Sequence, residues 1–357
     1  MTLTYPARRN ILVIQLGDIG DVVLSTTTFR AVKEAYPAAR LSALVRKGYG
    51  SLLAADPHLF EVVEVTKSRG KITEIGRENL RLARRLRSAG YDLVIDLRTG
   101  DRGAIMAFLT GAPDRVGRYE AGKPFWRDRI FTRLLRDPEP APPPVHPGAD
   151  QSLRLVREIG IDTADTHPRL VVSEEARENV RRLLDRSKAD GRDRLVTVNP
   201  FSRWKYKEWD GGKWSRIVDW LWGAHGLPAI VVGAREERTA AEEIVRRCRG
   251  PARNLAGETT LGELAALLET SRLHLGVDSA APHIAAAVGT PTVTIFGPSD
   301  WRAWIVQDAL HRAVTPDLPC APCHNKGCDG TERSICLEEM GEGKVRKTIG
   351  EVLEAMR

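Results

Sequence analysis

The sequence has no long apolar run. Among its 357 residues, no stretch of about 20 consecutive apolar residues occurs, which is the length that a membrane-spanning helix needs. The first residues, 1–10, contain no apolar core followed by a small-residue cleavage site, so no secretory signal is visible. From these two absences we expect a cytoplasmic protein.

The sequence also lacks the glycine fingerprint of a dinucleotide-binding domain. The uniformly apolar run Ile11–Leu16 predicts a short buried strand, and Gly17 and Gly20 mark the turn that follows it. A third glycine is missing, and an acidic residue occupies the turn that a pyrophosphate would have to approach. These features disfavour a Rossmann-type oxidoreductase.

The acidic residues of this turn have two interpretations. A carboxylate at the carboxyl end of a parallel strand lies where open α/β sheets bind their ligands, so Asp21 is a candidate general base. Alternatively, Asp18 and Asp21 are helix-start residues that complement the helix dipole. The segment alone does not separate the two.

Cysteine is scarce, and most of it lies in one segment. Four of the five cysteines are Cys320, Cys323, Cys328 and Cys336. A cytoplasmic location disfavours structural disulfides, and four thiols with one C-x-x-C pair are typical of a structural zinc site. The second C-x-x-C pair of a zinc knuckle is missing, so an iron–sulfur cluster or two redox-labile disulfides stay open as alternatives.

Apolar runs alternate with amphipathic stretches along both halves of the chain, which is the pattern of repeated βαβ units around parallel sheets. In the first half we expect strands at Ile11–Leu16, Leu41–Val45, Val62–Val65 and Asp92–Asp96, and helices at Val22–Ala35, Glu74–Ala89 and Arg102–Leu109. In the second half we expect strands at Leu195–Asn199, Ala229–Val232, Leu273–Val277 and Thr292–Phe296, and helices at Trp214–Trp222, Glu236–Cys248, Leu261–Glu269 and Ala280–Ala287.

This repetition, in a chain too long for one typical core, predicts two Rossmann-like α/β domains facing a cleft. We place the linker in the polar segment Asp162–Pro168. Residues 1–165 then form the N-terminal domain, and residues 166–357 form the C-terminal domain, with the cysteine segment at 320–336 and a C-terminal helix. The proline-dense stretch Pro138–Pro147 is expected to be a loop of the first domain.

One strand-to-helix turn of the second half has the features of an anion site. Asp278 and Ser279 follow a predicted strand and begin a predicted helix, where free backbone N–H groups and the helix dipole attract negative charge. His283 falls one turn further along and can reach the same anion. Alternatively, Asp278 and Ser279 only cap the helix and His283 is a core residue.

Two further strand ends of the second half carry charged candidates. Lys207 follows the strand that ends at Asn199, and a lysine there can meet a phosphate as a point charge. Glu237 follows Gly233, and its carboxylate can accept hydrogen bonds from ribose hydroxyls. The alternatives are a solvated loop lysine and a first-turn carboxylate that complements the helix dipole.

Positive charge is in excess and unevenly distributed. The formal net charge is +7, and basic residues concentrate at 67–87 and 115–136. Such clusters suit an anionic partner, although a solvated helix face is the alternative for any single arginine. Aromatic residues do not interleave with the first cluster, which argues against nucleic acid.

Taken in chain order, five motifs resemble glycosyltransferase family 9, the ADP-heptose:lipopolysaccharide heptosyltransferase family. The motifs are Gly20-Asp21-Val22-Val23, Lys207-Glu208-Trp209, Gly233-x-x-x-Glu237, Asp278-Ser279-Ala280-x-x-His283 and Gly297-Pro298-Ser299-Asp300. No single motif is decisive, but their common order and spacing over roughly residues 10–340 are specific. The family often has Thr-Gly where this chain has Ser279-Ala280.

The resemblance implies a GT-B fold and an inverting transfer of L-glycero-D-manno-heptose from ADP-heptose, without a catalytic metal. It implies that Asp21 is the base and that the donor is bound by Ser202, Lys207, Glu237, Asp278, Ser279, Ala280 and His283. The implied acceptor is lipid A with inner-core lipopolysaccharide at the cytoplasmic face of the inner membrane, a peripheral contact. Its phosphates would meet Arg77, Arg81, Arg84 and Arg85, which recur at helical spacing.

Two alternatives to this function stay open. A family relative can use another nucleotide sugar or another glycan acceptor. A non-catalytic nucleotide-binding protein can keep the same fold, although Asp21 favours an enzyme because donor binding alone has no need of that carboxylate.

Overall fold

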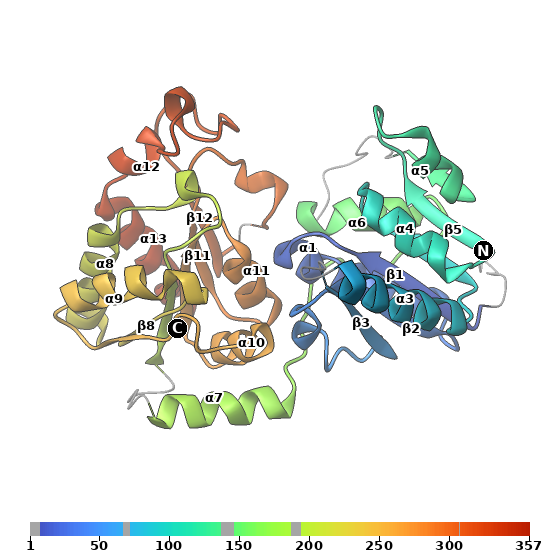
Figure 1. The fold of residues 1–357 in the computed structure, drawn as a ribbon. Coiled ribbons are helices and arrows are strands. Elements are labelled where there is room, and N and C mark those ends of the chain that lie inside the picture. The colour runs from blue at the N-terminus through green and yellow to red at the C-terminus, as the bar shows by residue number, and fades with distance from the viewer. Residues whose placement is uncertain (1–7, 67–71, 137–145, 187–193, 307) are drawn as a thin grey trace. The chain divides into compact units, whose positions relative to one another are not determined.

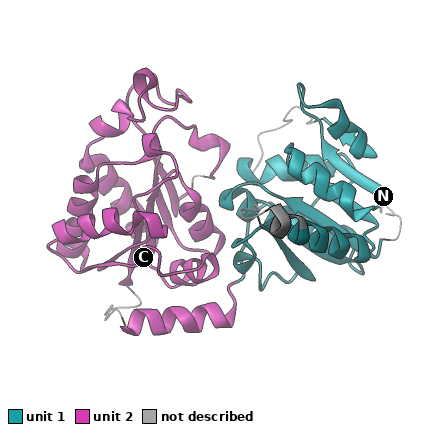
Figure 2. Cartoon of the chain, in the orientation of Figure 1, with its two compact units in different colours: residues 1–171 teal, residues 172–357 magenta. Residues whose placement is uncertain are grey.

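The computed structural model describes residues 8–66, 72–136, 146–186, 194–306 and 308–357. The chain divides into two compact units, Met1–Val171 and Val172–Arg357 (Figure 2). This division lies a few residues after the boundary placed from the sequence at residues 165 and 166. The proline-dense segment lies largely outside the described residues, and Pro147 begins a helix.

The first unit is built on a six-stranded parallel sheet with strand order β3-β2-β1-β4-β5-β6 (Figure 1). Residues 11–14 of the central strand β1 are fully buried, and β1 pairs with β2 and β4. A parallel strand covered on both faces needs continuous apolar side chains, which this run supplies. The strands are β1 (Asn10–Gln15), β2 (Arg40–Arg46), β3 (Glu61–Val65), β4 (Leu93–Asp96), β5 (Asp114–Arg118) and β6 (Arg133–Leu135).

Helices cover both faces of this sheet. The chain runs from β1 to β2 toward one edge and from β3 through β4 and β5 to β6 toward the other, so right-handed crossovers place α2 on one face and α3, α4 and α5 on the opposite face. The helix α4 packs against α3 and against α5, and α2 packs against α6. The helices are α1 (Ile19–Leu24), α2 (Thr26–Ala35), α3 (Ile72–Ser88), α4 (Asp101–Thr110), α5 (Phe125–Ile130) and α6 (Pro147–Arg157).

The helix predicted at Val22–Ala35 is two helices, α1 and α2, that meet at Ser25. The hydroxyl of Ser25 donates to the carbonyl oxygen of Asp21 at 2.7 Å and accepts from the Gln15 side-chain amide at 2.6 Å. A serine that bonds the neighbouring backbone in this way competes with regular helix bonding, which accounts for the break.

The second unit repeats the architecture with strand order β12-β11-β10-β7-β8-β9, again all parallel. Its strands are β7 (Val196–Asn199), β8 (Ala229–Val231), β9 (Ala252–Asn254), β10 (Leu273–Val277), β11 (Thr292–Ile295) and β12 (His311–Val314). Its helices are α7 (Glu174–Arg186), α8 (Gly211–His225), α9 (Arg238–Arg247), α10 (Leu261–Glu269), α11 (Ala280–Ala287), α12 (Ile335–Glu339) and α13 (Glu342–Ala355).

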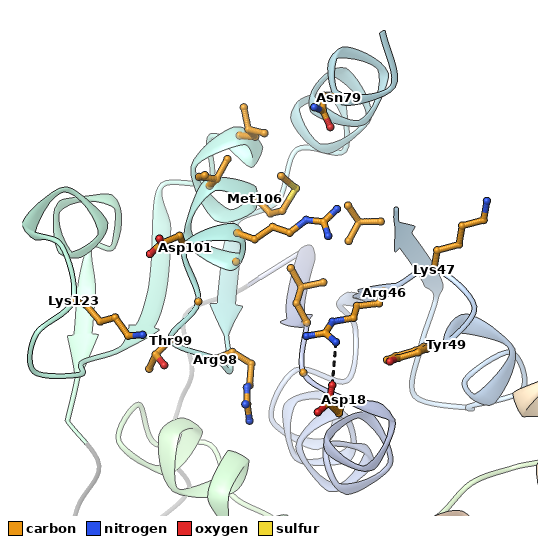
Figure 3. Close-up of a pocket in the computed structure, with 18 residues that line it drawn as sticks. Asp18, Arg46, Lys47, Tyr49, Asn79, Arg98, Thr99, Asp101, Met106 and Lys123 are labelled. Atoms are coloured by element: carbon orange, nitrogen blue, oxygen red, sulfur yellow. Dashed lines mark hydrogen bonds and ion pairs between the residues drawn. The ribbon is translucent and has the colours of Figure 1, made fainter. Parts of the chain in front are cut away.

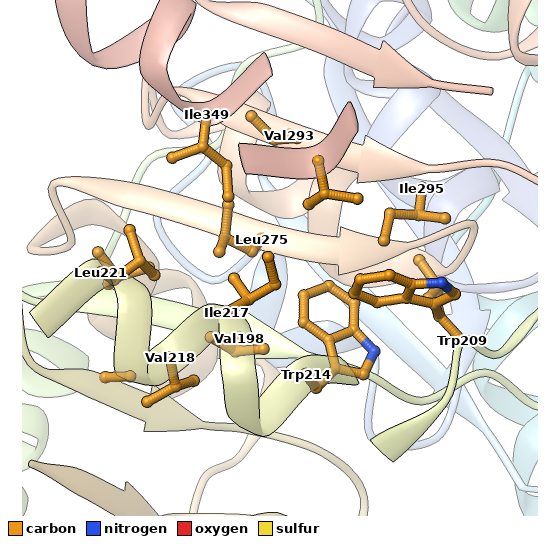
Figure 4. Packing of buried hydrophobic residues seen from close by; sticks show 14 of the residues in the cluster. Val198, Trp209, Trp214, Ile217, Val218, Leu221, Leu275, Val293, Ile295 and Ile349 are labelled. Carbon is orange, nitrogen blue, oxygen red and sulfur yellow. The ribbon is translucent and has the colours of Figure 1, made fainter. Parts of the chain in front are cut away.

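Two tryptophans anchor α8 to the sheet of this unit (Figure 4). The rings of Trp209 and Trp214 meet edge to face with their centroids 5.3 Å apart, and both side chains are buried. The indole N–H of Trp209 donates to the carbonyl oxygen of Met340 at 3.2 Å. This packing fixes the loop that connects β7 to α8, which carries two of the predicted donor-binding residues.

The sequence pattern does not predict β5, β6, β9, β12, α5 or α7. The strand β5 illustrates why, because it is short and charged at both ends, and Asp114 forms ion pairs of 2.7 and 2.6 Å with Arg8 and Arg133. Such segments become strands because their backbones pair with neighbouring strands, whatever their side-chain pattern. Within the described residues, no helix is both long and apolar enough to cross a membrane.

Candidate active site

The turn after β1 holds Asp21 through its backbone neighbours. Asp21 Oδ2 accepts a hydrogen bond from the backbone N–H of Asp18 at 2.8 Å. A Cβ atom at Gly17 would lie 2.3 Å from the same oxygen, so only glycine lets the carboxylate approach the turn so closely. The side-chain oxygen of Gln15 accepts from the N–H of Gly17 at 3.0 Å. The helix-start interpretation therefore accounts for the contact of one carboxylate oxygen of Asp21, Oδ2.

The second oxygen of Asp21 faces a cation that the sequence analysis missed. Asp21 Oδ1 lies 3.2 Å from Nη1 of Arg98, which follows the end of β4. Because β1 and β4 are adjacent parallel strands, their carboxyl ends meet at one edge of the sheet. The Asp21 side chain keeps 16% of its surface exposed, so a hydroxyl group can still reach the carboxylate.

A cavity of about 1150 Å³ opens at this edge of the first unit (Figure 3). It is lined by Gly17 and Asp18 from the β1 turn and by Arg98 and its loop, so it lies directly beside the Asp21 ion pair. Two acidic residues line it, Asp18 and Asp101, against a larger basic set: Arg46, Lys47, Arg98, Arg102 and Lys123. This excess suits an anionic or polyhydroxyl ligand.

Two of these cations lie close enough to repel one another. Burial and the charge of Arg46 both lower the pKa of Arg102 from its ordinary value. Arg46 Nη1 pairs with Asp18 Oδ1 at 3.0 Å, and Arg102 donates to the carbonyl oxygen of Thr66. Each guanidinium has five N–H donors, so both keep donors for a ligand that would also relieve the repulsion.

Two buried charged residues contact the backbone of the loop that carries Arg98. Asp96 and Arg127 are both fully buried, and burial raises the pKa of Asp96 to about 7 although Arg98 and Arg127 oppose that rise. Asp96 Oδ1 accepts from the backbone N–H of Arg98 at 3.1 Å, and a guanidinium nitrogen of Arg127 donates to the Arg98 carbonyl oxygen at 3.4 Å. Arg127 is therefore a core residue and not part of a solvated basic face.

In the second unit, three side chains from the end of β7 and the β7–α8 connection converge on the start of α11. Lys207 Nζ lies 2.6 Å from Asp278 Oδ2, and both side chains are mostly buried. The hydroxyl of Ser202 donates to the carbonyl oxygen of Asp278 at 3.3 Å, and the side-chain amide of Asn199 donates to Ser279 Oγ at 3.3 Å. Adjacent strands β7 and β10 bring these residues together.

The first turn of α11 leaves backbone donors for a ligand. Ser279 is the N-cap in an extended conformation, and its side chain makes no capping hydrogen bond. Ala280 begins the helix, and His283 lies one turn further on with its side chain half-buried. Backbone N–H groups at a helix start, together with the helix dipole, favour a bound anion, and Lys207 lies beside this start in its pair with Asp278.

Glu237 is committed to its own turn. Its Oε2 accepts from the backbone N–H of Ala234 at 2.6 Å, and burial raises the pKa of the carboxyl group. The first-turn interpretation thus accounts for the contact of one carboxylate oxygen of Glu237, Oε2. In the β7–α8 loop, Glu208 Oε1 accepts from the backbone N–H of Ser202 at 3.0 Å and from Lys205 Nζ at 2.9 Å.

The four predicted acceptor arginines lie on α3. Their side chains are exposed, and Arg85 also pairs with Glu61 on β3: the four are Arg77, Arg81, Arg84 and Arg85. None of them lines the cavity beside Asp21, to which α3 contributes Asn79. Lys67, Arg69 and Lys71 of the same basic cluster lie outside the described residues.

The cysteine segment runs from a loop into α12, where Cys336 packs into the core of the second unit. Cys336 is buried, and its burial together with the charges of the other three cysteines raises its pKa to about 11. Cys248, at the end of α9, is half-buried. In the part of the chain that the structure describes, no group of three or more His, Cys, Asp or Glu side chains is arranged to hold a metal ion.

Two α/β units with parallel sheets are the architecture of a GT-B glycosyltransferase, and here one unit has a carboxylate at a strand end and the other a lysine beside a helix start. Residues 79–332 match the family model of glycosyltransferase family 9 (heptosyltransferase), and the chain belongs to this family. The lipopolysaccharide heptosyltransferase 3 of Escherichia coli K12 is 30% identical over 80% of this chain and 82% of that protein.

Solved structures agree with the fold. The glycosyl transferase family 9 protein from Veillonella parvula superposes with a TM-score of 0.80 at 21% identity, covering 97% of each chain. The Escherichia coli ADP-heptose lps heptosyltransferase II gives 0.74 at 20% identity, covering 98% of this chain and 100% of that one. The Escherichia coli heptosyltransferase WaaC with ADP gives 0.73 at 16%, covering 96% and 99%. The GT-B prediction is confirmed.

Arg46, Arg98, Arg102 and Asn199 are site residues that the sequence analysis did not select. Asn199 and Arg98 end or follow predicted strands, which is a usable signal for a ligand-facing position. Arg46 is the last residue of β2, and Arg102 lies in the first turn of α4. Only the order of strands in the first sheet brings Arg46, Arg98 and Arg102 to the edge that carries Asp21.

Proposed function

We propose that this family 9 glycosyltransferase moves L-glycero-D-manno-heptose from ADP-heptose to an inner-core lipopolysaccharide acceptor. The relatives named lipopolysaccharide heptosyltransferases support the donor and acceptor classes, as does the related fold solved with ADP. The observation that carries the proposal is Asp21, a carboxylate at the carboxyl end of β1 beside a cationic cavity. Such a group activates a hydroxyl nucleophile.

In the proposed reaction, Asp21 takes the proton of an acceptor hydroxyl as the oxygen attacks the anomeric carbon of heptose. The bond from that carbon to the phosphate oxygen breaks, and ADP leaves with the bonding electron pair. A single displacement of this kind inverts the anomeric centre. Arg98 holds the Asp21 carboxylate in one orientation through the 3.2 Å ion pair.

We propose that residues of the second unit stabilise the negative charge on the departing ADP. We assign the pyrophosphate to Lys207, His283 and the free N–H groups at Ser279 and Ala280, with Ser202 beside them. Asp278 positions the Lys207 ammonium, and the remaining oxygen of Glu237 is assigned to the ribose hydroxyls. We propose that these groups replace a catalytic metal, so EDTA leaves turnover unchanged and strict magnesium dependence would contradict the assignment.

The acceptor is assigned to two places in the first unit. The cavity receives its reacting sugar and the neighbouring anionic sugars, which Arg46 and Arg102 can bind with their remaining donors. The exposed arginines of α3 are assigned to the phosphates of lipid A: Arg77, Arg81, Arg84 and Arg85. Because that acceptor is a lipid, we place the enzyme at the cytoplasmic face of the inner membrane.

The structural zinc site at Cys320, Cys323, Cys328 and Cys336 stays a prediction, and the described geometry does not form such a site. Metal analysis of the purified chain tests it. About one equivalent of zinc that is lost in a Cys323→Ser/Cys336→Ser variant would support the site, and metal-free protein with full activity would reject it.

Calorimetric titration of the purified chain with ADP, UDP and GDP tests the donor class, and a transfer assay with ADP-heptose tests the reaction. We expect binding of ADP in preference to the other two, and heptose transfer to a lipopolysaccharide that lacks its outer core. Preferential binding of UDP or GDP would indicate another nucleotide sugar. Nucleotide binding without any transfer would indicate a non-catalytic member of the fold.

A further inference from the structure

The outer surface of helices α3, α4 and α5 has an unusual composition. Five of the ten large apolar side chains that are exposed among the described residues lie on these three helices: Leu80 (50%), Ile105 (43%), Phe108 (61%), Phe125 (71%) and Trp126 (37%). We call these residues, with the exposed arginines beside them, the α3–α5 face. A surface helix normally presents polar residues outward, so such a concentration marks an interaction site.

The central helix of this face shows the pattern most clearly. Along α4, Gly103, Ala104, Met106 and Ala107 are buried against the unit. The outward stripe contains Ile105 and Phe108, three residues apart and therefore on one side of the helix. Ile105 also borders the cavity beside Asp21, whereas Phe108 is 61% exposed and does not line that cavity, so nothing in the unit's own packing requires Phe108 to be apolar.

Arginines lie directly between the apolar side chains. A groove between α3 and α4 is lined by Phe108 together with Arg84, Arg87 and Arg115. On α5, the Arg129 guanidinium lies 5.2 Å from the ring centroid of Phe125. Arg77, Arg81 and Arg85 add further exposed positive charge along α3.

This combination selects one class of partner. Exposed aromatic rings with interleaved arginines suit the interface of a bilayer, where rings enter the headgroup region and guanidiniums meet lipid phosphates. Protein–protein interfaces are also enriched in aromatic residues and arginine, but charged residues overall are depleted at their cores, whereas this face carries several exposed arginines, among them Arg81, Arg84 and Arg87. Resting on the proposed function for the membrane itself, we infer that the α3–α5 face is the surface that docks onto a phospholipid bilayer with anionic headgroups.

The position of the cavity is consistent with this docking. Asn79 of α3, and Arg102, Ile105 and Leu109 of α4, line the cavity beside Asp21. The same two helices therefore border both the cavity and the α3–α5 face. A lipid-anchored acceptor held at the bilayer surface would reach the cavity without leaving the membrane.

Co-sedimentation of the full chain with vesicles tests the inference without donor or acceptor. We expect binding to vesicles of phosphatidylcholine with about one-third phosphatidylglycerol, and at least tenfold weaker binding to pure phosphatidylcholine or in high salt. Phe108→Ser/Phe125→Ser should reduce binding at least tenfold, because it removes the two most exposed rings of the face. Arg87→Glu/Arg129→Glu should abolish the preference for anionic vesicles.

The chain offers matched controls. Trp222 is 45% exposed but lies on α8 of the second unit, so Trp222→Ser should bind vesicles like wild type. Arg182→Glu/Arg186→Glu reverses two exposed charges on α7 of the second unit and should also have no effect. Unchanged melting temperatures exclude misfolding as the cause of lost binding.

Three results would overturn the inference: equal binding of wild type to both kinds of vesicle, equal losses in Trp222→Ser and in the double phenylalanine variant, or a wild-type dimer that this double variant dissociates. The last result would make the face an interface between two copies of the chain. The inference and the proposed function can fail separately, since vesicle binding is measured without transfer. The double phenylalanine variant should still act on a short, acyl-free acceptor sugar.

Discussion

The two oxygens of Asp21 face different partners. Oδ2 is held by the backbone of the β1–α1 turn and Oδ1 by Arg98, so helix capping and the proposed base chemistry share one side chain. The same duality recurs in Glu237, whose Oε2 caps its own turn. A structural role for one oxygen therefore does not exclude a ligand at the other.

We expect Asp21→Asn to lower turnover by about a hundredfold or more, the usual scale of general base catalysis. The amide oxygen can still accept from the Asp18 N–H, so stability and donor affinity should stay close to wild type. Steady-state kinetics with calorimetry of ADP binding measures both. Near-normal turnover of the Asn variant would refute the assignment of the base.

Lys207→Ala should weaken ADP binding by about 1.5–3 kcal/mol, the range for hydrogen bonds to charged groups. The variant also leaves the Asp278 carboxylate unpaired at an anion site, so Lys207→Ala/Asp278→Asn should recover part of the loss. Lys205→Ala is the matched control, because Lys205 pairs with Glu208 instead. Equal ADP affinity in Lys207→Ala and wild type would remove Lys207 from the donor site.

His274 should make the protein sensitive to acid. Its ring is fully buried with Nδ1 3.0 Å from Thr197 Oγ1, and burial lowers its pKa to about 3. Below pH 6.5 the unfolded chain binds a proton that the folded chain does not, so this residue's contribution to stability falls by about 1.4 kcal/mol per pH unit toward pH 3. Urea unfolding of wild type and His274→Gln at several pH values should show their stability difference shrinking at that rate. A constant difference would contradict it.

At the scale of elements, the site is made by strand ends and the turns that follow them. The β1–α1 turn brings a carboxylate against Gly17, and the β10–α11 turn leaves N–H groups open beside Lys207. Both turns occupy the carboxyl edge of a parallel sheet, where adjacent helices begin and strands stop pairing. Repetition of one architecture thus supplies two chemically different half-sites.

Gly17→Ala tests the geometry of the first turn. The added Cβ would lie 2.3 Å from Asp21 Oδ2, so the carboxylate must move, and we expect a loss of about 1–3 kcal/mol in stability together with lower turnover. Gly223→Ala in α8 is the control, because a Cβ there meets no atom within 4 Å. That variant should be neutral or up to about 1 kcal/mol more stable. Full activity in Gly17→Ala would show that the close approach is dispensable.

At the scale of the whole molecule, the proposed acceptor and donor sites differ in how much exposed charge they carry. The chain carries a net charge of +7, and the basic residues assigned to the acceptor all lie in the first unit. Exposed charges are screened over roughly 8–10 Å at ordinary ionic strength, whereas the Lys207 pair in the second unit is mostly buried. The two substrates should therefore respond differently to salt.

We expect the Michaelis constant for a lipid A acceptor to rise with salt while that for the donor stays nearly flat. Arg81→Glu/Arg84→Glu should raise the acceptor constant as well, because these exposed α3 side chains are assigned to lipid A phosphates. With a short acceptor sugar that lacks lipid A, Arg81→Glu/Arg84→Glu should leave the Michaelis constant for the acceptor unchanged. Arg46→Gln/Arg102→Gln should raise that constant. If Arg81→Glu/Arg84→Glu leaves the Michaelis constant for the acceptor unchanged, the α3 arginines are only a solvated helix face.

The amino-acid sequence determined most of the fold by itself. Uniformly apolar runs such as Ile11–Ile14 can only be buried strands, and their alternation with amphipathic helices defines two parallel sheets. It also selected Asp21, Lys207 and Asp278, because each stands at or just after a strand end or a helix start.

Only the tertiary structure decided which residues share a site. Strand order places Arg46 of β2 and Arg98 after β4 on either side of the β1 turn, although the chain separates them widely. It also buried Arg127 in the core and left Phe108 exposed, the reverse of what their side chains alone predict. Position in a sheet depends on pairing between distant segments, and that pairing leaves no periodic trace in the local sequence.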